Sequence, residues 1–449
     1  TALPSIAADL HESPLQMQAA IISYMLTVAM LIPASGWLAD RFGTRRVFLF
    51  SILLFSAGSF FCAASVSLTQ LVIARIVQGI GGALMVPVGR LTILRVFPKE
   101  EFLRAMSLVV IPGLIGPLIG PLLGGWLVEH ASWEWIFLIN LPIGLLGIVL
   151  AMLYMPDLRE KTASFDWRGY LFFSGGIVLL SLALQMLGEQ HNAAGTFLLL
   201  ALPGAFALYA YFWHSQRHPH ALFSRSLFKA TNFRIGIIGN LVARLGSGAI
   251  PFLIPLFLQI GMGFNPVLAG LTMMPTALGA MGTKLLANWV VTRFGYRPIL
   301  MINTLLLGAL IAGFSLLGNH TPYLLLLLYL AIIGVLNSLQ FTAMNTLTLG
   351  GLEREEASSG NSLLSVVMQL SMSLGVAVSA TLFAWYYGSS AYLQSGPMTG
   401  PQQDEIMFAF HATFITVGCL SMLATLIFRQ LPSRNTFISS QEEARVIRR

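Results

Sequence analysis

Charged side chains are scarce in this sequence. They make up 10% of its 449 residues, while hydrophobic residues make up 56%. An ordinary soluble domain carries about 25% charged residues, so this chain has too little polar surface to dissolve as a globule of its length. The composition therefore excludes a soluble enzyme. The net charge of +7 does not indicate a nucleic-acid partner, because its placement along the chain matters more than its sum.

Several kinds of reactive site are also missing. The two cysteines, Cys62 and Cys419, lie in separate apolar stretches, so we interpret them as small core residues rather than as a disulfide or a metal site. No G-x-x-x-x-G-K-[ST] run exists, which excludes the phosphate-cradling loop of a primary pump. The histidines fall at or beyond the ends of apolar stretches, which disfavours a membrane haem or redox enzyme. We expect no catalytic residue, no metal and no cofactor.

Apolar stretches long enough to cross a bilayer recur along almost the whole chain. A hydrocarbon core about 30 Å thick requires about 20 helical residues. Thirteen complete spans are predicted, at residues 18–39, 47–64, 69–94, 105–127, 134–154, 170–187, 195–213, 235–259, 271–291, 299–317, 323–348, 363–387 and 407–428. Residues 1–8 are interpreted as the tail of a further span whose beginning is missing. The prediction is an all-α polytopic membrane protein.

The basic residues fix the direction of these spans. Of the 25 Lys and Arg residues, 21 lie in alternate breaks between spans or in the tail, and the other set of breaks holds none. Basic residues in short loops stay on the cytoplasmic side. We therefore expect the C-terminus to be cytoplasmic and the break at 9–17 to be external. With the incomplete span counted, the total is fourteen and the N-terminus is also inside.

An internal repeat divides the chain. Residues 41–45 read RFGTR and residues 293–297 read RFGYR, and both copies follow a predicted span on the cytoplasmic side. Such symmetry is typical of transporters built from two parallel repeats. The copies are eight spans apart instead of six, so two spans at 170–213 are inserted. The predicted domains are an N-terminal bundle at 1–154, two linker helices with their loops at 155–234, a C-terminal bundle at 235–429 and a cytoplasmic tail at 430–449.

The first copy of the repeat carries a candidate gating loop. Asp40 ends a predicted helix, where the macrodipole disfavours an anion, so it needs Arg41, Arg45 or the N-terminus of another helix as a partner. This arrangement predicts a charge latch, although a solvated cytoplasmic loop would explain the same residues. In the second copy Thr292 stands at the position of Asp40, so a matching latch there is in doubt. The gating-loop candidates are Gly36, Asp40, Arg41, Gly43, Arg45 and Arg46.

The span at 105–127 is rich in glycine and proline. It contains Gly113, Gly116, Pro117, Gly120, Pro121, Gly124 and Gly125. Glycines four residues apart share one helix face, where another backbone can approach closely, and the prolines favour a kink. The pattern indicates a helix at a moving interface, with ordinary helix packing as the alternative.

Four basic residues lie within predicted spans. Arg75, followed by Gln78, should face a partner or a watery cavity, because an embedded arginine costs about 3 kcal/mol and keeps its proton. Arg90 is close enough to the cytoplasmic end to reach it. Arg244 and Lys284 lie near mid-membrane and are cavity candidates. The amides at similar depth, which could equally be packing contacts, are Asn240, Asn337, Gln340 and Gln369.

These runs resemble the motifs of the major facilitator superfamily. The run 36–46 resembles its loop after span two, the Arg75 run its span-four motif, and the run 113–125 its antiporter motif of span five. Residues 1–4 (TALP) and 133–142 (WEWIFLINLP) are similar to signatures of the fourteen-span drug:proton antiporter branch. The resemblance implies a monomeric transporter of the bacterial inner membrane that exports small molecules against protons by alternating access. It assigns gating to the Asp40 loop and proton relay to Arg75.

The sequence shows no acidic residue in the middle of a span, although proton coupling usually needs one. In this branch the motif ahead of residues 1–4 usually contains an aspartate, so we expect the coupling acid on that preceding stretch. Embedded cations without an acid also fit a second substrate class, organic anions or metal chelates such as citrate complexes. They could instead neutralise the expected aspartate. A membrane sensor that has lost transport is the remaining alternative. The expected partners are a small-molecule substrate, protons and the lipid bilayer.

Overall fold

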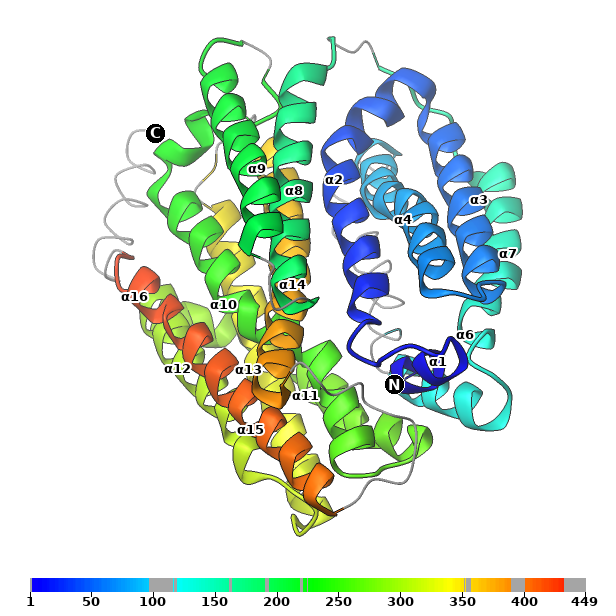
Figure 1. Ribbon diagram of the computed structural model, residues 1–449. Coiled ribbons are helices and arrows are strands. Elements are labelled where there is room, and N and C mark those ends of the chain that lie inside the picture. Colours follow the sequence, from blue (N-terminus) through cyan, green and yellow to red (C-terminus); the bar gives the residue numbers. More distant parts are fainter. Residues whose placement is uncertain are drawn as a thin grey trace.

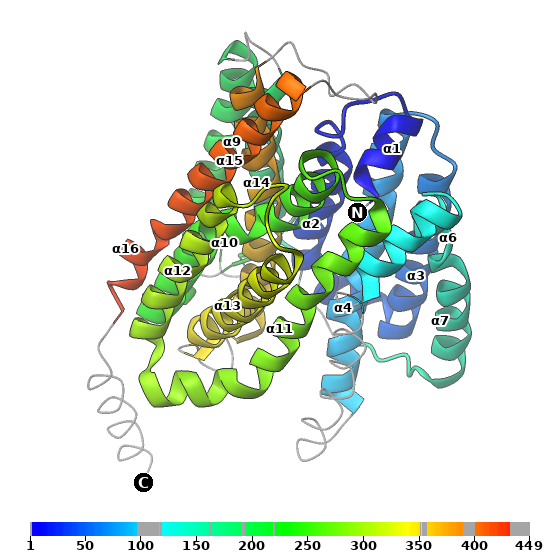
Figure 2. The same cartoon turned by 90° about the horizontal axis from the view of Figure 1, so that it is seen from below.

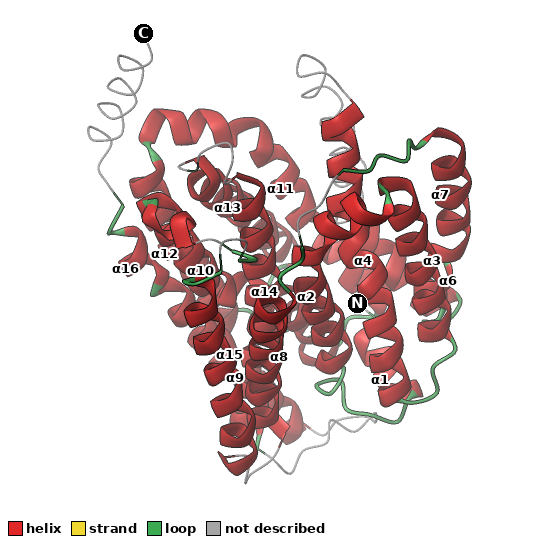
Figure 3. Cartoon of the chain, turned by 90° about the horizontal axis from the view of Figure 1, so that it is seen from above, coloured by secondary structure: helices red, strands yellow, loops and turns green. Residues whose placement is uncertain are grey.

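The computed structural model describes residues 2–96, 116, 119–160, 164–189, 194–218, 221–223, 225–350, 352, 357–388 and 400–431. These residues form helices and connecting loops, and no strand occurs among them. Most helices run side by side as bundles (Figure 1), with short loops at their ends (Figure 3). The predicted all-α membrane fold is confirmed.

The N-terminal half contains α1 (Leu3–Asp9), α2 (Gln18–Phe42), α3 (Thr44–Ala63), α4 (Leu68–Val96), a helix over 119–130, α6 (Trp135–Leu138) and α7 (Asn140–Tyr154). Helix α4 packs between α2 and α3, and α3 also contacts α7. The close crossing of α3 and α4 requires glycine, because a Cβ on Gly58 would overlap the backbone of Gln78.

The C-terminal half contains η1 (Arg225–Lys229), α10 (Thr231–Leu256), η2 (Phe257–Gly261), α11 (Pro266–Phe294), α12 (Tyr296–Gly313), η3 (Phe314–Leu316), α13 (Tyr323–Gly350), α14 (Ala357–Tyr387), α15 (Gly400–Met422) and α16 (Ala424–Phe428). Its core is aromatic near the predicted external end. The rings of Phe314 and Phe414 stack with centroids 4.6 Å apart, and Phe257 packs edge-on against both. These rings are almost fully buried, so they hold η2, η3 and α15 together.

Two further helices, α8 (Trp167–Glu189) and α9 (Ala194–Ser215), lie between the halves in the sequence. They pack against each other, and α8 also contacts α14 and α2 (Figure 1). Much of α9 is exposed, including Leu199 and Phe206 at 71% each. A surface this apolar is suited to lipid. Two six-helix halves with two inserted helices are the architecture that the sequence predicts.

Eleven helices are long and apolar enough to cross a membrane among the residues that were searched. They correspond to eleven of the thirteen predicted spans. Most of the span at 105–127 lies outside the described residues. The span at 271–291 is helical within α11, but Gly, Pro and Thr dilute its apolar side chains and it is not one of the eleven.

The internal repeat is visible in the backbone. Gly43 joins α2 to α3 with a φ of +100°, and Gly295 joins α11 to α12 with a φ of +83°. Only glycine adopts this region readily, so the glycine in each copy allows one helix to end and the next to begin without an intervening loop. The equivalent turns support the assignment of these segments as repeats.

Candidate functional site

Arg75 of α4 lies at the centre of a polar network inside the N-terminal half. Its Nε donates to the carbonyl of Ala20 at 3.0 Å, and its Nη1 donates to Gln78 Oε1 at 2.5 Å. Gln78 is 2% exposed, and its Nε2 extends the network by donating to Ser59 Oγ at 2.7 Å. The amide of Asn140 also donates to Ser59 Oγ, at 3.3 Å. Four helices therefore contribute to one network.

The Arg75 network contains a cation and no carboxylate. None of the ion pairs found within the described ranges includes Arg75. The guanidinium instead lies over the ring of Tyr24, 4.2 Å from its centroid. A desolvated arginine over an aromatic face gains about 2 kcal/mol, which offsets part of the cost of burial. The polar and aromatic contacts of Arg75 thus stabilise a positive charge inside the N-terminal half.

Arg244 of α10 is a second embedded cation, and it is only 5% exposed. Its Nε donates to Asn240 Oδ1 at 2.9 Å, and Asn240 is fixed by a bond to the carbonyl of Gly236 at 2.9 Å. The guanidinium lies 4.6 Å from the centroid of Phe341 on α13. Its Nη2 is buried without a hydrogen-bond partner in the described part of the chain. A buried donor without a partner is costly, so this atom marks a place where an acceptor would bind.

The other predicted cavity residues, Lys284, Gln340 and Asn337, differ in their exposure and in their contacts. Lys284 of α11 is exposed and takes part in none of the ion pairs of the described ranges. Gln340 is 3% exposed and occupied within the half, since Asn303 donates to its Oε1 at 2.7 Å and its Nε2 donates to Thr304 Oγ1 at 2.7 Å. Asn337 is half-buried on the same helix. The contacts of Gln340 are thus those of a packing residue between α12 and α13.

The gating loop pairs differently from the prediction. Asp40 binds Arg95, with Oδ1 2.7 Å from Nη2, and the expected partners Arg41 and Arg45 make no ion pair with it. Arg95 lies in the last turn of α4, and it also contacts Glu160 Oε1 at 3.1 Å. The prediction of a neighbour in the sequence was wrong because α4 and α2 run side by side and end together, which places Arg95 closer than the loop arginines.

The rest of the loop is tied to the segment after α7. Thr44 Oγ1 donates to the carbonyl of Pro156 at 3.0 Å and accepts from the N–H of Leu158 at 3.1 Å. Asp157 contacts Arg46 at 3.7 Å, and it also fills the space beside Gly43, where a Cβ would overlap its carboxylate. Gly36 is exposed, with open space around its Cα. These contacts join the N-terminal half to the start of the segment that follows it in the chain.

The glycine-rich helix lies at the border of the two halves. Gly113 and Pro117 are outside the described residues, while Gly116 and Gly120 are exposed and have open space. Gly124 is buried. A Cβ on Gly125 would overlap the carbonyl of Pro266, and one on Gly270 would overlap the carbonyl of Pro121. The helix over 119–130 and α11 therefore touch backbone to backbone. Figure 2 shows α11 in green, reaching toward the N-terminal half.

Sequence reasoning missed a polar contact beside this crossing. Glu129 Oε1 accepts from Asn265 Nδ2 at 3.3 Å, and Oε2 accepts from the backbone N–H of Val267 at 3.2 Å. These bonds join the N-terminal half to the start of α11 at the predicted external end. Asn265 before Pro266 is a sequence signal for the start of a helix, and the first N–H groups of a helix need acceptors from outside it. Nothing in the sequence indicated Glu129 as their partner.

Comparison with known proteins agrees with this architecture. The profile of the Major Facilitator Superfamily matches residues 1–376. The chain is 47% identical over 436 residues to MdtD of Serratia proteamaculans (strain 568), covering 97% of this chain and 90% of that protein. It is 46% identical over 447 residues to MdtD of Cronobacter sakazakii (strain ATCC BAA-894), covering 99% and 93%. Both relatives are named for multidrug resistance, and they confirm the resemblance of the sequence motifs to MdtD-like transporters.

A solved structure shares the fold. The crystal structure of a POT family transporter in complex with 5-aminolevulinic acid superimposes with a TM-score of 0.68. The sequences are 16% identical, and the alignment covers 93% of this chain and 88% of that one. At this identity the likeness concerns the arrangement of helices alone.

Proposed function

The chain belongs to the Major Facilitator Superfamily as a multi-pass transporter of the bacterial inner membrane, and from this premise we propose that it exports small molecules of the multidrug type in exchange for protons. The Arg75 network is the observation that carries this proposal. It keeps a permanent cation among polar groups of four helices inside the membrane. Such a site can lower the cost of ionising an acid, and proton binding and release at that acid would couple transport to the gradient.

Alternating access is the proposed mechanism. The backbone contact of Gly125 with Pro266 and the hydrogen bonds of Glu129 join the halves at the predicted external end. The ion pairs of Asp40 and Asp157 at the predicted cytoplasmic end join residues of the N-terminal half to each other and to the segment directly after α7. This distribution favours a state that is closed outside, from which the halves would rock to open the external side and close the cytoplasmic side.

A transport assay in proteoliposomes tests the coupling. Full-length protein is reconstituted with a pH gradient, and ethidium movement and internal pH are followed together. We expect ethidium transport that stops when an ionophore removes the gradient, and a proton flux that requires ethidium. Transport that persists at the same rate without the gradient would contradict proton coupling. Absence of movement with every cargo would favour a membrane sensor.

A second substrate class is supported by Arg244. Its buried Nη2 has no hydrogen-bond partner among the described residues, and the carboxylate of an organic anion or of a citrate chelate would supply the acceptor. Citrate is therefore compared with ethidium in the same vesicles, with wild type, Arg244→Ala and Lys284→Ala. Citrate transport that is lost in Arg244→Ala would support an anion exporter. Ethidium efflux sensitive to Lys284→Ala, with no citrate effect, would contradict it.

The proposal also includes the orientation of the protein in the membrane, its oligomeric state and its gating loop. The C-terminus is placed in the cytoplasm, because 21 of the 25 basic residues lie on that side in the predicted topology. The transporter is proposed to act as a monomer, with gating by the Asp40 loop. A C-terminal fusion to a reporter that is active only in the cytoplasm tests the orientation.

A further inference from the structure

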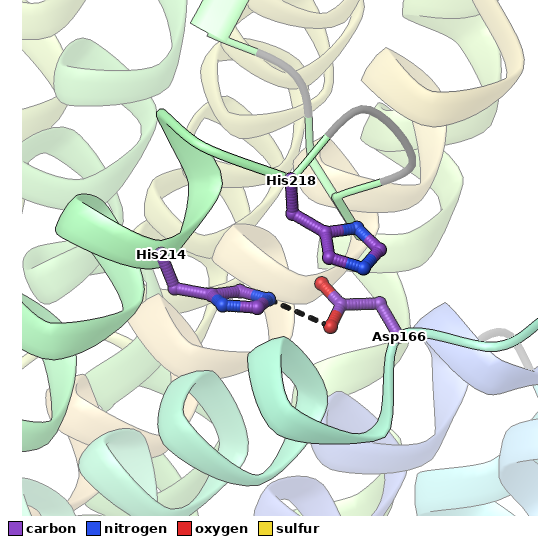
Figure 4. A group of neighbouring side chains, drawn as sticks. All are labelled: Asp166, His214 and His218. Atoms are coloured by element: carbon purple, nitrogen blue, oxygen red, sulfur yellow. Dashed lines mark hydrogen bonds and ion pairs between the residues drawn. The ribbon is translucent and has the colours of Figure 1, made fainter.

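Three side chains at the predicted cytoplasmic ends of the inserted helices converge on one point. Asp166 directly precedes α8, His214 lies in the last turn of α9, and His218 follows four residues later in the turn after α9 (Figure 4). The transport mechanism proposed above uses none of them. Asp166 and His218 lie just outside the membrane spans Trp167–Leu184 and Gly195–Ser215, and His214 is the second-to-last residue of the latter span.

The three groups are close enough to share an ion. His214 Nε2 is 2.8 Å from Asp166 Oδ1, and the two imidazole rings face each other with centroids 5.1 Å apart and planes 28° from parallel. One ligand atom from each of the three residues can be chosen so that all lie within 4.8 Å of one another. His218 Nδ1 is buried and has no hydrogen-bond partner within the described ranges. This nitrogen is the unexplained polar atom of the cluster.

The carboxylate of Asp166 is held in place by the backbone. Oδ1 accepts from the N–H of Gly169 at 2.9 Å, which caps the start of α8, and Oδ2 accepts from the N–H of Leu222 at 3.3 Å. Burial raises the pKa of Asp166, but these bonds and His214 outweigh it and bring the pKa below its ordinary value. The residue is 6% exposed, so an ionised carboxylate is fixed in a nearly dry position beside two imidazoles.

We propose that Asp166, His214 and His218 bind one divalent transition-metal ion of the Zn²⁺ type. Imidazole nitrogen and carboxylate oxygen are the ligands that this class of ion prefers, with three protein groups and water completing the coordination. Two ligand atoms on tetrahedral Zn²⁺ are about 3.3 Å apart, so a pair at the 4.8 Å limit would have to approach by about 1.5 Å. His218 can supply this movement because it lies beyond the end of α9.

A metal ion bound at this site would connect several segments of the chain. The site links the start of α8 to the end of α9 and to the segment that leads into the C-terminal half. That segment already folds back on α9, since the hydroxyl of Tyr211 accepts from the N–H of Phe223 at 2.9 Å. Helix α8 also contacts α2 and α14, which belong to different halves. A bound ion would therefore brace the inserted pair where it meets both halves.

Metal binding to the purified full-length chain tests the proposal. Metal-free protein in detergent is titrated with Zn²⁺ against a fluorescent chelator, and with Co²⁺ while its visible absorption is recorded. Wild type is expected to bind about one Zn²⁺ per chain and to give the intense bands of four-coordinate Co²⁺. His218→Ala is expected to weaken binding about tenfold or more, since removal of one of three ligands costs at least as much as loss of a supporting residue.

The variants separate binding from folding. His218→Ala leaves the contact of Asp166 with His214 intact, so its melting temperature without metal should equal that of wild type, while Zn²⁺ should raise only the wild-type value. His320→Ala removes an exposed histidine at the opposite end and is the matched control. Equal Zn²⁺ affinity in wild type, His218→Ala and the double variant His214→Ala with His218→Ala would overturn the proposal, as would wild type that binds no metal.

Discussion

Glu129 accepts a hydrogen bond from the backbone N–H of Val267 at 3.2 Å, and these residues belong to different halves of the transporter. Helix α11 begins at Pro266, which has no N–H, and its next donors are those of Val267 and Leu268. Asn265 Oδ1 accepts from Leu268 at 2.7 Å, so Glu129 completes the cap from across the interface. A carboxylate at this position is also favoured by the helix dipole. The start of α11 is thus fully capped only while Glu129 of the other half stays in contact with it.

Replacing Glu129 should favour the state that is open outside. Glu129→Ala removes the cap, and a hydrogen bond to a charged group is worth about 1.5 kcal/mol, or about tenfold in the equilibrium between states. The readout is the labelling of Leu122→Cys, in a background with both native cysteines replaced by serine, with an impermeant maleimide added outside. Faster labelling is expected in Glu129→Ala. The control Asp404→Asn alters an exposed acid and should label as the parent does. Equal labelling rates in the parent, Glu129→Ala and Asp404→Asn would contradict a role of Glu129 in closing the external end.

Gly125 and Gly120 provide a matched pair on one helix. Gly125→Ala adds a methyl group where it overlaps the carbonyl of Pro266, whereas Gly120→Ala points into open space. We expect Gly125→Ala to prevent closure of the external end and to reduce ethidium transport about tenfold or more, because overpacking costs about 1–3 kcal/mol. Transport by Gly120→Ala should stay within about twofold of wild type. Similar losses in both variants would show that the glycines serve the helix itself.

Arg75 should tolerate no substitution. Arg75→Lys keeps the charge but cannot bind Ala20 and Gln78 together, so transport should fall nearly as far as in Arg75→Ala. Arg90→Lys, at an exposed position of the same helix, is the control and should transport normally. Rates are measured in vesicles with equal amounts of protein. A transport rate of Arg75→Lys equal to that of wild type would show that a positive charge is sufficient at this position and that the guanidinium group is not required.

The Asp40 and Arg95 pair should contribute to stability of the N-terminal half. Removing Asp40 should cost about 1 kcal/mol, and removing Arg95 should cost more, because Arg95→Ala also loses the contact with Glu160. The double variant should cost little more than Arg95→Ala, because the contact with Asp40 is then already lost. Thermal unfolding of Asp40→Ala, Arg95→Ala and the double variant measures the coupling. Arg45→Ala, the partner that the sequence suggested, should leave the melting temperature unchanged. Additive effects of Asp40→Ala and Arg95→Ala would refute the pair.

The fold could be predicted from the sequence because a membrane restricts the choices. Backbone groups in hydrocarbon must be satisfied within helices, so length and hydropathy locate the spans. Eleven described helices match predicted spans, and the repeated RFG run locates the two turns with positive φ at Gly43 and Gly295. The span at 271–291 shows the limit of this rule, because a helix that lies at the border of the halves is less apolar.

The candidate site could be predicted only in part. Arg75 and Arg244 stand out in the sequence because an embedded charge is costly, and both occupy polar surroundings in the structure. Gln340 stands out in the sequence as an embedded amide, yet it already makes hydrogen bonds with Asn303 and Thr304. An embedded polar residue in the sequence does not reveal whether its neighbours already satisfy it. For Asp40, the nearest arginine in sequence was not the nearest in space.

By itself the sequence determined the membrane class, eleven of the spans and the family, because these depend on residue type and spacing along one chain, and it predicts the direction of the spans. Only the tertiary structure decided which groups meet. Arg95 reaches Asp40 and Glu129 reaches Val267 through the packing of helices that are not adjacent in the sequence, and the packing of α8 against α9 brings Asp166 near His214 and His218. Such contacts depend on crossing angles and on where helices end, and residue spacing along the chain does not encode either quantity directly.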